Sequence, residues 1–134
     1  MDLSTHKNEI LQPLREKAKF ALRDENAAWT AIEASVETAL RLPSSAVLET
    51  LVYSLALIYV NQTGAMPGFS NSDNETLFER FAVSVIKPVI PTVTRNQVKY
   101  AIRKIDAKKS DRFRADLGKL TTGLKLVQNI RPAE

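Results

Sequence analysis

Cysteine is absent from this chain, and histidine occurs once, as His6. A chain without thiols cannot form a disulfide, a zinc–thiolate site or a cysteine nucleophile. The single histidine lies in a terminal stretch that we expect to fray, which makes it a poor member of a catalytic triad or a metal site. We therefore expect no metal, no cofactor and no catalytic residue.

Glycine is also scarce, with four residues in all. Phosphate-binding loops, dinucleotide fingerprints and zinc-protease motifs are absent from the sequence. Among the carboxylates, Glu75 and Glu79 are four residues apart on one helical face and could bind a hard cation. Such a pair more commonly forms a solvated surface, so the prediction is a protein that is not an enzyme.

The first ten residues lack the basic start and the apolar stretch of a secretory signal, which predicts a cytoplasmic protein. No segment shows sustained alternation of apolar and polar residues, so we expect no β-sheet. Apolar residues make up 44% of the chain and charged residues 25%, as in ordinary globular proteins. The prediction is one helical domain over residues 1–130, followed by a tail at 131–134.

Residues 46–60 are the most apolar stretch of the chain. Their apolar side chains occur on every side of a helix, a pattern typical of a helix that is buried all round. Fifteen helical residues rise only about 22 Å, against about 30 Å for the hydrocarbon core of a bilayer. We therefore expect a buried central helix at about 45–61, within a compact all-α bundle of five to six helices.

Several residues predict where the helices begin and end. Pro13 is expected at the first position of a helix, and the apolar stripe from 14 to 40, which includes Trp29 as a core residue, forms one helix or two with a break at 23–26. Ser44 or Ser45 could cap the central helix, and Gly64 is expected to end it.

The second half of the chain contains two capping-box patterns, at 72–75 and 94–97. Phe78 and Phe81 are expected in the core, and the two prolines of segment 87–91 predict a stiff extended spacer or a ligand for a proline-recognising partner. A further helix is expected to end near 107, and Ser110 is expected to cap the last helix.

Charge is distributed unevenly along the chain. Residues 95–134 contain 11 Lys and Arg against 4 Asp and Glu, a net charge of +7, whereas residues 1–94 contain 8 against 11, a net charge of −3. A basic segment of this kind can neutralise phosphates and release their counterions, although the same residues could simply solvate a helical face. The partner predicted on this basis is nucleic acid or an acidic protein.

The basic segment has the outline of a helix-turn-helix, with a helix at 95–106, a turn at 107–109 and a helix from 110. Asp111 and Asp116 would oppose phosphate there, and the turn lacks glycine. The candidate nucleic-acid-binding residues are Arg95, Lys99, Arg103, Lys104, Lys108, Lys109, Arg112 and Arg114.

The competing hypothesis is a protein–protein interaction module or a homodimer. The last helix carries apolar residues at alternating steps of four and three, but two glycines weaken it, so it would need to dock on the rest of the chain or on a second copy. This candidate seam consists of Phe113, Leu117, Leu120, Leu124 and Val127. In the predicted loop at 62–73, Met66 and Phe69 could contact a partner or cover the end of the bundle.

Overall fold

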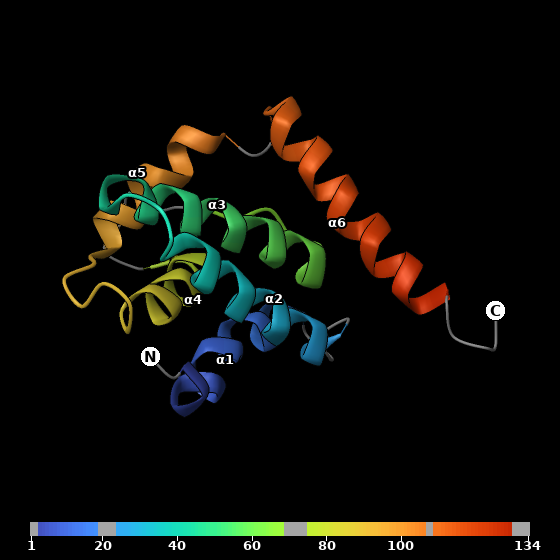
Figure 1. Cartoon of the computed structure of the whole chain (residues 1–134), viewed down its shortest axis with the longest axis horizontal. Helices are drawn as coiled ribbons and strands as arrows, with labels where there is room; N and C mark the ends of the chain where they lie inside the picture. The colour runs from blue at the N-terminus through green and yellow to red at the C-terminus, as the bar shows by residue number, and fades with distance from the viewer. Residues whose placement is uncertain (1–2, 19–23, 69–74, 107–108, 130–134) are drawn as a thin grey trace.

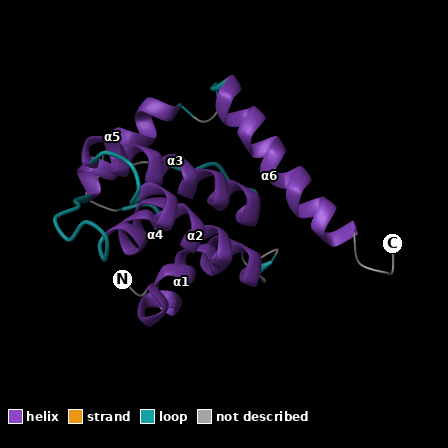
Figure 2. Cartoon of the chain, in the orientation of Figure 1, coloured by secondary structure: helices purple, strands orange, loops and turns teal. Residues whose placement is uncertain are grey.

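The structure, a computed structural model, describes residues 3–18, 24–68, 75–106 and 109–129, with side chains as far as residue 120. These residues form helices and connecting turns, with no strand among them (Figure 2). The elements are η1, a short 3-10 helix (Leu3–His6), α1 (Lys7–Ala18), α2 (Glu25–Ala39), α3 (Ser44–Thr63), α4 (Leu77–Ile86), α5 (Arg95–Ile105) and α6 (Asp111–Asn129). The predicted all-α bundle is confirmed, while the predicted tail lies outside the described residues.

Helix α3 is the centre of the bundle, as Figure 1 shows. It packs against α1, α2, α4, α5 and α6, and Leu51, Val52 and Leu55 have no exposed surface. It ends where the sequence predicts, at Gly64, which has a positive φ of 75° and whose N–H donates to the carbonyl of Val60 at 2.8 Å. The buried central helix is therefore confirmed.

Helix α3 is longer than the fifteen-residue apolar stretch that the sequence shows, so its length does not exclude a membrane span. The helix has 20 residues, which corresponds to about 30 Å, and with a mean hydropathy of 1.3 it is long and apolar enough to cross a bilayer. The core helices of water-soluble proteins also meet these two criteria. The five helices packed around α3, and not its length, support its interpretation as a core helix.

The stripe from 14 to 40 forms two helices. Asp24 caps α2 by accepting the N–H of Ala27 at 3.0 Å, which confirms the predicted break, although residues 19–23 lie outside the described part. Trp29 is buried as predicted. The expectation for Pro13 is wrong: it lies inside α1, because the chain already enters that helix through η1 and Lys7.

Two predicted helix caps are also wrong. Pro43 occupies the cap position of α3 and makes no side-chain hydrogen bond there, so neither serine that follows it caps the helix. The capping box of α4 is not at 72–75, a segment that falls mostly outside the described residues; it is formed by Thr76 and Glu79, whose reciprocal hydrogen bonds measure 3.1 and 2.7 Å. The box forms at Thr76 and Glu79 because the apolar run of α4 follows Thr76 directly.

The connection from α4 to α5 differs from the predicted extended spacer. The N–H groups of Val89 and Ile90 both donate to the carbonyl of Ile86, at 2.8 and 2.7 Å, so the segment folds back in turns. It does so because both side chains pack against the core. The capping box of Thr94 and Gln97 is confirmed, and Phe78 and Phe81 are fully buried as predicted.

Candidate nucleic-acid interface

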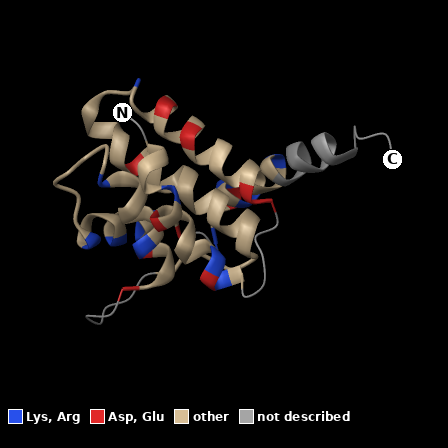
Figure 3. Ribbon diagram, turned by 90° about the horizontal axis from the view of Figure 1, so that it is seen from below, with Lys and Arg blue, Asp and Glu red and all other residues tan. Residues whose placement is uncertain are grey.

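Helix α5 carries four of the predicted basic residues and no acidic residue. Val98, Ala101 and Ile102 bury one of its faces, and the helix packs against α3 and α4. With 3.6 residues per turn, the remaining polar positions of α5 lie away from this buried face. Figure 3 marks Lys and Arg positions along the chain in blue and Asp and Glu positions in red. The outer face of α5 consists of the exposed residues Asn96, Gln97, Tyr100, Arg103 and Lys104, with the half-buried Lys99 at its edge.

Arg95 lies beside that face and forms part of the fold. Its Nε donates to Oε1 of Glu79 at 3.1 Å, and the Glu79 side chain has no exposed surface. The expectation that Glu79 forms a solvated surface with Glu75 is therefore wrong. Because a buried carboxylate requires a partner, Arg95 is committed to holding α5 against α4.

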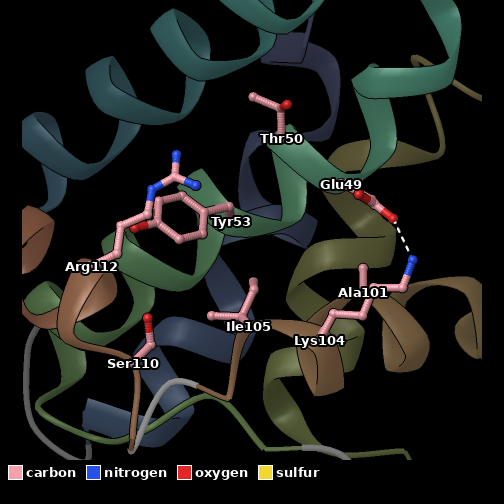
Figure 4. A pocket seen from close by; sticks show the side chains of 8 residues that line it. All are labelled: Glu49, Thr50, Tyr53, Ala101, Lys104, Ile105, Ser110 and Arg112. Carbon is pink, nitrogen blue, oxygen red and sulfur yellow. Dashed lines mark hydrogen bonds and ion pairs between the residues drawn. The ribbon is translucent and has the colours of Figure 1, made fainter.

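Lys104 reaches from α5 to α3. Its Nζ lies 2.7 Å from Oε1 of Glu49, and both side chains are largely exposed (Figure 4). An exposed pair of this kind contributes little to stability and is screened by salt, so the Lys104 ammonium can exchange Glu49 for another anion at small cost. The pair lies at the edge of a cleft of about 330 Å³ between α3, α5 and the start of α6.

Arg112 occupies the other side of this cleft, and its side chain is largely exposed. Its guanidinium lies 4.9 Å from the ring centroid of Tyr53, over the ring face, as Figure 4 shows. The Tyr53 hydroxyl donates a hydrogen bond to Asp116, which also lies 3.8 Å from Nε of Arg112. Burial, together with this hydrogen bond, raises the pKa of Tyr53 to about 12.

The first turn of α6 faces the bundle. Phe113 is buried with its ring edge-on to Tyr53, at a centroid separation of 5.7 Å, and its N–H donates to Oγ of Ser110 at 3.1 Å, which confirms the predicted cap. Arg114 is exposed, 3.5 Å from the carboxylate of Asp111. Each arginine at the start of α6 therefore has a carboxylate beside it, Asp116 for Arg112 and Asp111 for Arg114.

The turn between α5 and α6 contains two of the predicted basic residues, of which the structure describes only Lys109. Asp106 ends α5 in the left-handed conformation with φ of 48°, and its carbonyl accepts the N–H of Lys109, whose side chain is exposed. Lys108 lies outside the described residues.

The residues of the predicted seam on α6 lie in different environments. Phe113 and Leu117 pack on the chain's own core, and Leu120 lines an apolar groove of about 350 Å³ with Leu57 and Ile58. The side chains of Leu124 and Val127 lie outside the described part. In the loop after α3, Met66 is exposed and Phe69 lies outside the described residues.

Sequence reasoning missed Tyr100 as a surface residue. Its side chain is 63% exposed, the highest value among the large apolar and aromatic residues that the structure describes. The signal was present in the sequence, because Tyr100 falls on the side of α5 opposite Val98, Ala101 and Ile102.

In the described part of the chain, no group of three or more His, Asp or Glu side chains could hold a metal ion. His6 has one nearby carboxylate, that of Glu9, 3.7 Å from its Nδ1.

Known proteins offer no template for this surface. No protein-family model matches the chain, and neither the curated proteins nor the solved structures compared with it include a match.

Proposed function

We propose that this chain is a non-catalytic nucleic-acid-binding protein and that the outer face of α5 contacts the phosphates. The observation that carries the proposal is the absence of any carboxylate from α5 together with the alignment of Lys99 and Arg103 on its outer face. Four helical residues separate these two cations by about 6 Å along the axis, so they can bind successive parts of one strand. Binding would release counterions and would need no contact with base edges.

The other basic residues divide between the fold and the surface. Arg95 is bound to the buried Glu79, and the exposed Arg112 lies over the ring of Tyr53, 3.8 Å from the carboxylate of Asp116. Lys104 extends the outer face of α5, whereas Arg114 lies beside the carboxylate of Asp111. We therefore assign phosphate binding to α5 rather than to the start of α6, which a helix-turn-helix would place in a groove.

Charge-removal variants test the proposal. The variant Lys99→Ala/Arg103→Ala removes two cations from the outer face of α5. The control, Lys17→Ala/Lys87→Ala, removes two exposed cations from α1 and the end of α4. Binding of a labelled oligonucleotide to the wild type should weaken as salt rises, with a log–log slope of about −0.7 per phosphate contacted on a single strand. The first variant should bind more weakly, with a slope smaller by about 1.4, and the control should match the wild type. Equal binding by both variants would reject the site.

The competing proposal is an interaction module or homodimer that uses α6. Its support is Leu120, whose half-buried side chain lies in the apolar groove beside Leu57 and Ile58. Apolar association survives salt, whereas phosphate binding does not. A dimer in light scattering at several hundred millimolar salt, with no oligonucleotide bound at low salt, would favour this alternative. Location in the cytoplasm stays a prediction under either proposal.

A further inference from the structure

Tyr100 differs from the other aromatic residues that the structure describes. The rings of Tyr53, Tyr59 and the buried phenylalanines pack in pairs, with centroid separations between 5.3 and 6.4 Å. Trp29 is buried beneath the ammonium of Lys7. Within the described residues the side chain of Tyr100 has neither a ring contact nor a hydrogen-bond partner, so the fold makes no use of its phenol.

The surroundings of Tyr100 suit a nucleobase with its phosphates. On a helix, residues three and four apart are neighbours, so Arg103 and Lys104 lie next to Tyr100 on one side and Asn96 on the other. An exposed ring offers a face on which a base can stack, cations beside it can hold the backbone, and an amide can donate and accept hydrogen bonds at a base edge.

From this arrangement we propose, on the basis of the function proposed above, that Tyr100 is a stacking platform and that the ligand is single-stranded nucleic acid. In a duplex the two faces of each base are covered by its neighbours, so a ring on a helix surface finds no face to stack on. In a single strand the bases can be splayed onto an aromatic side chain while Lys99 and Arg103 contact the phosphates. Base recognition of this kind tolerates sequence changes, because every base has a π-face.

A matched pair of variants separates the ring from the charge. Tyr100→Leu removes the ring but keeps an apolar helix former, and Tyr100→Phe keeps the ring without the hydroxyl. Fluorescence anisotropy would use a labelled DNA strand of about 16 nucleotides, the matching duplex, and an abasic strand of equal length that keeps the phosphates but lacks bases. Because Tyr100 is exposed, neither variant should change the thermal midpoint.

Tyr100→Leu is expected to weaken binding of the single strand by at least about fivefold, and Tyr100→Phe by no more than about twofold. Both variants should bind the abasic strand as the wild type does. An equal loss on the abasic strand would show that Tyr100 acts on the backbone, and a wild-type preference for the duplex would show that the ligand is double-stranded; either result overturns the inference.

The two proposals fail in different ways. If Tyr100→Leu binds the single strand like the wild type while Lys99→Ala/Arg103→Ala binds weakly, stacking is rejected and phosphate binding by α5 stands. If the wild type binds none of the three oligonucleotides at low salt, the proposed function itself is rejected.

Discussion

The carboxylate of Glu79 and the guanidinium of Arg95 join α4 to α5 through a bond of 3.1 Å between Oε1 and Nε, inside a site where the Glu79 side chain has no exposed surface. The same Oε1 atom accepts the N–H of Thr76 at 2.7 Å, so one carboxylate both starts α4 and holds α5. Its Oε2 atom is buried without a hydrogen-bond partner among the described residues. The orientation of α5, and with it the candidate interface, therefore depends on Glu79.

Replacement of Glu79 should separate these two roles. Glu79→Ala removes the cap and leaves Arg95 without its carboxylate, so the free energy of unfolding should fall by about 2–4 kcal/mol. Glu79→Gln keeps an acceptor for Thr76 and should cost less, about 1–2 kcal/mol. Urea denaturation measures both. The control Glu75→Gln removes an exposed carboxylate 3.8 Å from Arg80 and should cost under about 0.5 kcal/mol. Equal losses in Glu79→Ala and Glu75→Gln would contradict the structural role.

The central position of α3 can be tested with a leucine pair. Leu55 has no exposed surface, whereas Leu40 at the end of α2 is 52% exposed. Leu55→Ala should lower the free energy of unfolding by about 2–5 kcal/mol, since it removes buried methyl groups and leaves a cavity. Leu40→Ala loses the same atoms from the surface and should stay within about 0.5 kcal/mol of the wild type. Chemical denaturation would refute the buried position if both variants lost the same small amount.

Tyr53 should give the protein a pH dependence in the alkaline range. Its pKa is raised to about 12 by burial and the hydrogen bond to Asp116, against about 10 in an unfolded chain. Folding thus favours the protonated phenol; this stabilisation is complete below about pH 10 and is lost as the pH rises through about 12. Tyr53→Phe cannot titrate, so its free energy of unfolding should fall less than that of the wild type over this window.

Urea denaturation at about pH 9 and about pH 11.5 measures this difference. The pKa of Tyr59 is also raised by burial, but Tyr59 is present in both proteins and cancels in the comparison. A gap between wild type and Tyr53→Phe that stays constant with pH would contradict the prediction.

Docking of α6 should depend on Phe113. The ring is buried against Tyr53, and Phe113→Ala should cost about 3–5 kcal/mol in thermal or chemical unfolding. Arg114→Ala, one position later on the exposed side of the same turn, is the control and should be nearly neutral. If Phe113→Ala were as stable as this control, the docking of α6 through Phe113 would be contradicted.

Local patterns predicted the features that depend on neighbouring residues alone. The caps at Asp24, Thr94 and Ser110 and the stop at Gly64 involve groups within about one helical turn, so a few residues determine them. The apolar composition of 46–60 predicted a core helix because every face of it needs cover.

Two of the wrong predictions concern segments whose structure depends on distant partners. The cap of α4 is Thr76 and not the expected segment 72–75. Its capping box includes Glu79, the same carboxylate that binds Arg95. The segment 87–91 folds into turns because Val89 and Ile90 can reach the core. No local pattern indicates such a gain in buried apolar surface.

The sequence by itself determined that this protein is helical, which segment forms its centre, and that positive charge gathers in its last third. Only the tertiary structure decided which cations serve the fold and which remain at the surface. Arg95 binds a carboxylate sixteen positions earlier, Arg112 lies over a ring on α3, and the face that α5 turns towards α3 and α4 leaves Tyr100 outside with Arg103. The physical reason is that helical period assigns residues to faces, whereas burial of the apolar face against a distant helix decides which charges must be paired.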